Sequence, residues 1–200
     1  MGIAERKERE KQQLKDKIVD AATGLFLDQG FDRTSIRMIA DRIEYSPATI
    51  YLHFKDKNEL FAEVSERAFA LFFEYFSAVL SVSDPLERLK TLGKQYLKFA
   101  SENPAYYDLM FVNNAPMEHE DQPWSGERSH DILINTVREC MDQGHFKGHE
   151  LHPLSLAIWS AVHGLASLKL RRRLSMYEGD NVEQLMEDSM DAINMILDRA

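Results

Sequence analysis

Apolar residues recur at intervals of three and four along almost the whole chain, and they show no strand pattern. The stripe through Leu14, Ile18 and Phe26, which ends before Gly30, is one example of this helical period. Because a half-buried strand requires a period of two, the pattern predicts an all-α protein of about nine helices. At 200 residues and 44% hydrophobic, the chain has enough apolar material for a well-packed core.

Two short helices are expected close together near the N-terminus. Thr34 or Ser35 caps the first, and Ser46 caps the second, which begins at Pro47 and extends to about Phe54. Only the stretch "IEYS" separates them. Helices joined by so tight a turn cross steeply, as in a helix-turn-helix, whose second helix can lie in the major groove of DNA.

The second short helix has two faces. Ile50 and Phe54 fall within about 40° of each other and belong to a small core, whereas Ala48, Thr49 and Leu52 point away from it. Small residues allow close approach to base edges, and the Thr49 or Leu52 methyl groups can meet a thymine methyl. Donors at the edges of this helix suit phosphate oxygens: Tyr51, His53 and Lys57. The start of the preceding helix offers free amides and a cation to a further phosphate: Thr34, Ser35 and Arg37. The alternative is a small structural bundle in which Tyr51 and His53 are merely half-exposed.

Charge is distributed unevenly along the chain. The net charge is −9, but residues 1–60 hold 11 basic and 11 acidic side chains, so the remaining 13 basic and 22 acidic side chains carry all of it. This asymmetry suits a protein whose first part meets a polyanion. We therefore expect a DNA-binding domain over 1–60 and a helical effector-binding and dimerisation domain over 61–200.

Several other classes are disfavoured. The sequence has no apolar run of about 18 residues for a membrane span, and no secretory signal at its charged N-terminus. One cysteine, Cys140, excludes an internal disulfide framework and indicates a cytoplasmic protein. No nucleophile elbow, phosphate-binding glycine loop or paired-carboxylate motif is present, so we expect neither an enzyme nor a cofactor. Zinc accepts the atoms of Cys140, His145, His149 and His152, but their spacing fits no common site, so we predict no metal.

The segment from Lys17 to Phe61 resembles the DNA-binding domain of the TetR family of bacterial transcriptional regulators. Three patterns occur in order: A-x-x-L-F-x-x-x-G-F from Ala22, T-S-x-x-x-I-A from Thr34, and S-x-x-T-I-Y-x-H-F-x-x-K-x-x-L from Ser46. The later stretch "AIWSAVHGLASL" resembles a subgroup with a W-x-x-x-H-G motif.

The resemblance implies specific roles. Pro47, Ala48 and Thr49 approach the bases, although some members carry a polar base-reading side chain at the position of Pro47. Further contacts to backbone or bases are implied for Arg37, Tyr51, His53 and Lys57. The resemblance also implies a homodimer, usually a repressor, that a small-molecule ligand releases from a palindromic DNA operator. Two alternatives remain: a helical ligand-binding protein, or a DNA-binding protein that organises the chromosome.

Aromatic residues are concentrated in the middle of the chain, where they suggest a small-molecule pocket among helices. Trp159 and His163 lie four residues apart on one helix face. The predicted pocket comprises Phe69, Phe72, Phe73, Tyr96, Phe99, Tyr107, Phe111, Trp159 and His163. Ordinary core packing at helical spacing is the alternative.

A loop is expected over 113–126, and two apolar helices, about 154–176 and 182–199, end the chain. Two such helices from each of two chains can form a four-helix interface. The predicted dimer interface comprises Leu154, Ile158, Ala161, Leu165, Leu168, Met186, Met190, Ile193 and Leu197. The competing explanation is burial of these residues within one chain.

Overall fold

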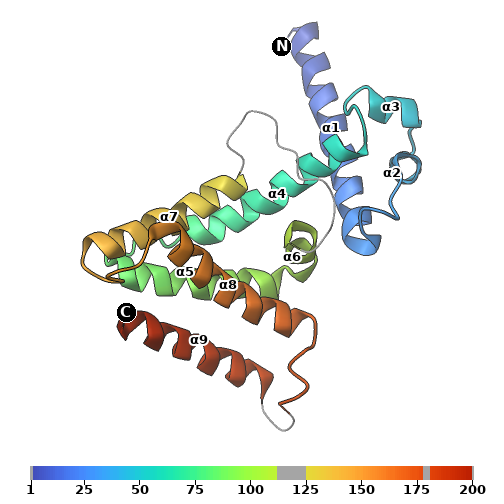
Figure 1. The fold of residues 1–200 in the computed structure, drawn as a ribbon. Coiled ribbons are helices and arrows are strands. Elements are labelled where there is room, and N and C mark those ends of the chain that lie inside the picture. The colour runs from blue at the N-terminus through green and yellow to red at the C-terminus, as the bar shows by residue number, and fades with distance from the viewer. Residues whose placement is uncertain (1, 112–124, 178–180, 200) are drawn as a thin grey trace. The chain divides into compact units, whose positions relative to one another are not determined.

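The computed structural model describes residues 2–111, 125–177 and 181–199. Within these ranges the chain forms nine helices and no strand, which confirms the predicted all-α fold (Figure 1). The loop predicted over 113–126 lies outside the described residues except for its last two positions, as do residues 178–180 of the loop before the last helix. The helices are α1 (Ile3–Gln29), α2 (Ile36–Ile43), α3 (Pro47–Tyr51), α4 (Lys57–Ser77), α5 (Pro85–Glu102), α6 (Pro104–Phe111), α7 (Ser125–Asp142), α8 (Leu151–Leu170) and α9 (Val182–Arg199).

Local capping explains where the short helices begin. The Ser35 hydroxyl accepts a hydrogen bond from the Met38 amide at 3.2 Å, and Ser46 accepts one from the Thr49 amide at 3.3 Å. Pro47 occupies the first turn of α3, where an amide hydrogen has no helical partner. Ser35 rather than Thr34 is therefore the cap of α2.

Several helix ends differ from the predicted ones. α3 ends at Tyr51 instead of about Phe54. α8 begins three residues early because Pro153 is tolerated in the first turn, where its missing amide hydrogen costs no bond. It ends at Leu170, and Arg172 then takes a left-handed conformation with φ of 52°, which a helix does not contain.

The described chain divides into two compact units within α4. The first unit comprises α1, α2, α3, α4 up to Ala68, and α6 from Ala105. The second comprises α4 from Phe69 onward, α5, α7, α8 and α9. The division lies close to the boundary expected at residues 60–61. The functional division expected there, between DNA binding and effector binding, stays a prediction.

In the first unit, α2 packs on α1 and α3 packs on α2 (Figure 1). Its core contains Ile18, Ile39, Ile50 and Leu60, all with no exposed surface. At one end of this core the rings of Phe26, Phe31 and Phe61 meet with centroids 4.9–5.8 Å apart. A tight apolar core of this kind holds α3 rigidly while leaving its outer face free.

In the second unit, α5 is the central helix, since α7, α8 and α9 all pack on it. Gly93 of α5 faces α9: a Cβ there would stand 2.6 Å from the Met190 Cε. The absence of a side chain at Gly93 therefore lets Met190 approach the α5 backbone. Other buried residues of α5, α7, α9 and the segment between α7 and α8 complete this core: Leu86, Leu89, Leu133, Val137, Cys140, Phe146 and Leu197.

Candidate functional site

The outer face of α3 and the residue that follows it are exposed on the first unit. Tyr51 is 55% exposed and Leu52 80% exposed, although an apolar side chain gains nothing from contact with water. Pro47 and Ala48 are exposed beside them. This face has the small and apolar groups that approach bases in a major groove.

Polar groups surround this face. Ser35 and Arg37 lie exposed near the start of α2, and the Arg37 guanidinium, 84% exposed, is 4.0 Å from the Asp41 carboxylate. An ion pair that long and that exposed is worth little, so Arg37 remains available to a phosphate. The Thr49 hydroxyl is hydrogen-bonded to the Ser46 hydroxyl at 3.1 Å, which ties it into the cap of α3.

His53, just after α3, is half-buried. Burial lowers the pKa of His53 from its usual 6.5, and the positive charges of Lys11 and Lys15 lower it further. His53 is therefore neutral at pH 7, so it can donate a hydrogen bond but adds no positive charge to this surface.

Thr34 does not lie on this surface, contrary to the prediction. Its side chain is only 1% exposed. The hydroxyl donates to the Gly30 carbonyl at 2.8 Å, and the backbone amide donates to the Phe31 carbonyl at 3.2 Å. Thr34 thus closes the loop between α1 and α2 and positions Ser35 and Arg37.

Lys57 also differs from the prediction of a phosphate contact. Its ammonium donates to the Phe31 carbonyl at 2.9 Å and to the Thr34 carbonyl at 3.1 Å. It also stands 3.9 Å from the centroid of the Phe31 ring. With two donors used and the third side against an aromatic face, Lys57 fastens the start of α4 to the α1–α2 loop.

Replacing Lys57 by Met should destabilise the first unit while leaving the salt dependence of DNA binding unchanged. Met preserves the apolar stem but removes both hydrogen bonds from a charged donor, a loss of about 1–3 kcal/mol. Hydrogen exchange of the α2 amides should accelerate accordingly. Lys55→Met, at an exposed neighbouring position, serves as the control. Lys57→Met could instead make DNA affinity less dependent on salt without accelerating hydrogen exchange. That result would mean that Lys57 contacts a phosphate, as the sequence predicted.

The aromatic residues predicted to line a pocket mostly pack against one another. The Phe72 ring lies 5.5 Å from Tyr96 and 5.0 Å from Phe99, both in edge-to-face contact. Phe69 is buried on the same helix, whereas the Phe73 ring stands 4.0 Å below the Arg128 guanidinium. The Tyr107 and Phe111 rings have centroids 5.1 Å apart and planes tilted by 54°, and both residues belong to the first unit.

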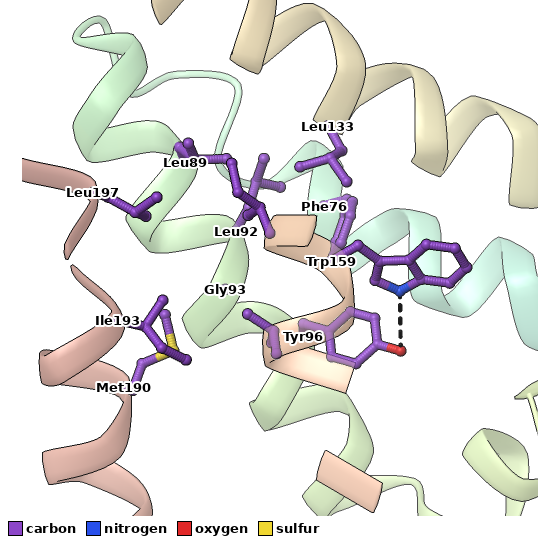
Figure 2. Close-up of a pocket in the computed structure, with 12 residues that line it drawn as sticks. Phe76, Leu89, Leu92, Gly93, Tyr96, Leu133, Trp159, Met190, Ile193 and Leu197 are labelled. Atoms are coloured by element: carbon purple, nitrogen blue, oxygen red, sulfur yellow. Dashed lines mark hydrogen bonds between the residues drawn. The ribbon is translucent and has the colours of Figure 1, made fainter. Parts of the chain in front are cut away.

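A small apolar cavity lies between α5, α7, α8, α9 and the end of α4, which contributes Phe76 (Figure 2). Its volume is about 30 Å³, which is close to the volume of one water molecule in the liquid. Of the predicted pocket residues only Tyr96 and Trp159 line it, and Gly93, Met190 and Ile193 lie on its α5 and α9 sides. The cavity can therefore accept a larger molecule only if a side chain such as Met190 moves.

A polar triad lies beside this cavity. The Tyr96 hydroxyl is 2.8 Å from His163 Nδ1, and the Trp159 indole donates to the same hydroxyl at 3.4 Å (Figure 2 shows the second bond). The Tyr96 hydroxyl can accept from the indole while donating to an unprotonated His163 Nδ1. Burial lowers the pKa of His163 below 6.5, which favours that neutral imidazole.

This burial predicts a pH dependence of stability. Because the folded state binds the His163 proton less readily than the unfolded state, the free energy of unfolding should fall as pH drops through 6.5. His163→Asn should flatten this dependence between about pH 7 and about pH 5, measured by thermal unfolding. His149→Asn, at an exposed position, should leave it unchanged. Equal slopes for the wild type and His163→Asn would show that His163 is not the titrating group.

A second depression, of about 430 Å³, lies between α5 and α9. Lys94 and Lys98 lie on its α5 wall, and Glu187 and Asp191 on its α9 wall, while Met190 lines both this groove and the apolar cavity. Its volume is in the range of small-molecule sites, unlike that of the cavity. The sequence did not indicate this groove, because it depends on how α9 packs against α5.

The apolar stripe predicted to form the dimer interface is largely occupied within one chain. Met186, Met190 and Leu197 of α9 are buried, so burial within the subunit, the competing explanation, applies to them. Ile193 of α9 and two residues of α8 pack against the same core: Leu154 and Ile158. Of the predicted α8 residues, Ala161 and Leu168 are exposed and Leu165 is half-buried.

A different apolar surface remains exposed on these two helices. It comprises Leu156 and Leu168 of α8 and Met195 and Ile196 of α9, with Ile196 67% exposed. On α8 the intervening exposed positions are small residues, Ala157, Ser160 and Ala161, which permit close approach of another helix. We call these seven residues the α8–α9 outer face. Sequence periodicity missed it because α9 shows apolar residues on both of its sides.

The histidine-rich break after α7 does not assemble into a ligand set. Cys140 faces the core, where burial raises its pKa to about 11, while His149 and His152 are exposed. Among the described residues no group of three or more His, Cys, Asp or Glu side chains is placed to hold a metal ion. No helix in the described ranges is long and apolar enough to cross a membrane.

The fold and the exposed face of α3 define a helix-turn-helix protein with an appended helical bundle. Residues 18–64 match the family described as bacterial regulatory proteins, tetR family. Residues 89–193 match the tetracyclin repressor-like C-terminal domain. The second match alone covers more than half of the chain, and the chain therefore belongs to the TetR family.

Curated relatives resemble part of the chain. The chain is 39% identical over 64 residues to the HTH-type transcriptional regulator AcrR of Shigella flexneri, covering 32% of this chain and 30% of AcrR. It is 30% identical over 109 residues to the negative transcriptional regulator IcaR of the biofilm operon of Staphylococcus aureus, covering 52% of this chain and 56% of IcaR. The chain thus spans about a third to a half of the length of these relatives.

Solved structures share the fold over nearly the whole chain. A protein of unknown function from Rhodococcus sp. RHA1 aligns with a TM-score of 0.74 at 22% identity, covering 92% of this chain and 95% of that one. The TetR family regulator PfmR of Thermus thermophilus aligns at 0.63 and 22% identity, covering 89% and 97%. FadR of Bacillus subtilis, solved with stearoyl-CoA, aligns at 0.66 and 14%, covering 88% and 96%.

Proposed function

We propose that this chain is a DNA-binding transcriptional regulator that places α3 in the major groove. The observation that carries this function is the exposed α3 face of Ala48, Tyr51 and Leu52 on a unit whose sequence matches the family's regulatory domain. With Thr34 buried and Lys57 bonded to backbone carbonyls, the proposed DNA surface is Ser35, Arg37, Pro47, Ala48, Thr49, Tyr51, Leu52 and His53.

The groups on this surface divide between bases and phosphates. Pro47, Ala48 and Leu52 offer no hydrogen bonds from their side chains, so they read shape and thymine methyl groups. Arg37 and the Tyr51 hydroxyl are suited to phosphates, which set the register of α3 but carry no sequence information. Base specificity from direct side-chain hydrogen bonds is consequently small, and thymine contacts and DNA shape contribute more.

Two subunits are needed to read a palindromic operator. We assign the contact between them to the α8–α9 outer face, since the described part of the subunit leaves its large apolar residues exposed. This assignment replaces the buried α9 residues of the sequence prediction and retains Ala161 and Leu168 of α8.

The effector site is proposed at the groove between α5 and α9, together with the apolar cavity behind Met190. The groove presents three lysines and three carboxylates: Lys94, Lys98, Lys169, Glu183, Glu187 and Asp191. Lys169 is paired with Glu183 at 2.7 Å, and Met190 lines both the groove and the cavity. Displacement of Met190 would join the two spaces into a site for a molecule with a charged end and an apolar end. The structurally similar FadR of Bacillus subtilis was solved with stearoyl-CoA, a ligand that has both kinds of group. Binding of such a ligand would shift α9, which carries Met195 and Ile196 of the outer face, and release a repressor from its operator.

Selection of bound fragments from random duplex DNA tests the function directly. We expect enrichment of a palindrome whose half-sites lie about one helical turn apart. Screening small molecules for release of the bound operator then tests the effector site. Enrichment of no sequence, with weak salt-dependent binding to all DNA, would favour the chromosome-organising alternative. The absence of any DNA binding would leave only a helical ligand-binding protein.

A further inference from the structure

The first half of α1 does not pack into the core of the first unit. Residues 4–13 are all exposed, and α1 joins the core only from Ile18 onward. The family's regulatory domain likewise matches from residue 18. An exposed helical segment with no apolar face gains nothing from folding alone, which raises the question of what this segment contacts.

Contacts of α1 place this segment beside α3. The Lys17 ammonium donates to the Ile43 carbonyl at 3.2 Å and stands 5.2 Å from the centroid of the Tyr45 ring, just before α3. Lys15 stands 5.6 Å from the Phe54 ring centroid, just after α3. α1 therefore passes both ends of α3 at residues 15–17.

Beyond that crossing, α1 continues toward the N-terminus for a considerable length. Residues 2–14 extend it by about 20 Å at 1.5 Å per residue. Figure 1 shows these turns projecting past α2 and α3 of the same unit. The segment thus extends beyond the part of the unit that α3 occupies.

Basic residues of this segment lie on two different faces. Lys7, Lys11 and Lys15 follow one another at four-residue spacing, within about 80° around the helix, and this row leads to the buried Ile18. Arg6 and Arg9 lie on the opposite side, where Arg6 pairs with Glu10 at 2.7 Å. The lysine row is therefore on the side of α1 that packs in the unit.

Lys7 and Lys11 are the free cations of the row. Lys15 is paired with Glu63 at 2.9 Å, whereas neither Lys7 nor Lys11 has a hydrogen bond or ion pair among the described residues. The charge of Lys11 is close enough to His53 to affect its titration, which places Lys11 on the α3 side of the helix. Glu8 borders the lysine row, so the net positive charge of this face is modest. Any effect of the row on binding therefore depends on local contacts rather than on a general positive field.

We infer that Lys7 and Lys11 bind backbone phosphates of the same DNA duplex, flanking the base pairs that α3 contacts. Their role rests on the proposed function, because only an operator bound at α3 brings phosphates to this row. Such contacts set no sequence preference but add affinity and a dependence on salt.

The test compares two double variants of the full chain. Lys7→Gln/Lys11→Gln and Arg6→Gln/Arg9→Gln each remove two positive charges from the same segment, and Gln preserves helix propensity. Binding to a selected operator is measured over a range of salt concentrations, and circular dichroism checks the helix content of each variant. Loss of two phosphate contacts should reduce the slope of log affinity against log salt by about 1.8. Between 50 and 200 mM salt the wild type should accordingly lose about 12-fold more affinity than the lysine variant. The arginine variant should match the wild type.

Each other outcome has a defined meaning. An unchanged slope for the lysine variant, with the wild type still binding its operator, would overturn this inference alone. Equal reductions of the slope in both variants would also overturn it, because they would show that the overall positive charge of the segment, and not contacts of Lys7 and Lys11, affects binding. Failure of the wild type to bind any DNA would overturn the proposed function itself. Shortening the operator by its flanking base pairs should abolish the difference between the wild type and the lysine variant, and persistence of that difference would contradict the placement of the row.

Discussion

Ala48→Glu is expected to reduce operator affinity by about 100-fold or more without altering the fold. Ala48 is exposed on α3, so the described residues leave room for a larger side chain there. In the complex, however, the carboxylate would face base edges between two rows of phosphates. Juxtaposed like charges cost several kcal/mol, and about 2.8 kcal/mol already corresponds to about 100-fold in affinity.

Ala78→Glu provides the matched control for this variant. Ala78 is exposed in the turn that follows α4, and the substitution adds the same charge and the same side chain. We expect its affinity for the operator to differ from that of the wild type by little, as measured by fluorescence anisotropy at one salt concentration. Equal losses in the two variants would mean that net charge, rather than the α3 face, governs binding.

Ile196→Glu is expected to convert the protein from dimer to monomer. Ile196 is 67% exposed on α9, so glutamate at this position costs little in the isolated subunit. Within an interface of two α8–α9 outer faces, the carboxylate would be desolvated without a partner. Operator affinity should fall by about 100-fold or more, since linkage of two half-site contacts commonly adds a factor of about 10² to 10⁴.

Leu80→Glu is the control, because Leu80 is a large exposed apolar residue, 51% exposed, outside the α8–α9 outer face. Sedimentation velocity at micromolar concentration should show a dimer for Leu80→Glu and a monomer for Ile196→Glu. A dimeric Ile196→Glu variant would refute the assignment of the interface to this face. A monomeric wild type would show that no stable contact forms there at all.

Local chemistry accounts for the part of the structure that was predictable. Ser46 followed by Pro47 predicts the start of α3, and the Ser46 hydroxyl does cap it. At the start of α4, the Asp56 carboxylate likewise accepts from the Glu59 amide at 2.9 Å. These interactions span three or four residues, so the sequence alone specifies them.

The roles of Lys57 and Thr34 illustrate what local pattern leaves open. A lysine at the start of a helix near a DNA-binding face is equally suited to a phosphate or to a backbone carbonyl, because both accept from an ammonium. The fold decides between them by bringing the Phe31 and Thr34 carbonyls within 3.1 Å of the Lys57 ammonium. Those two partners lie 26 and 23 residues away in sequence.

The helix count, the helix-turn-helix and its exposed face were therefore determined by the sequence, through helical period and capping. The partners of each apolar stripe were decided only by the tertiary structure. Met186, Met190 and Leu197 are as apolar as an interface requires, yet α9 turns them toward its own subunit and leaves Met195 and Ile196 outside. The physical reason is that the hydrophobic effect has no direction: it requires that a stripe be buried, and the packing of the whole chain selects the surface that buries it.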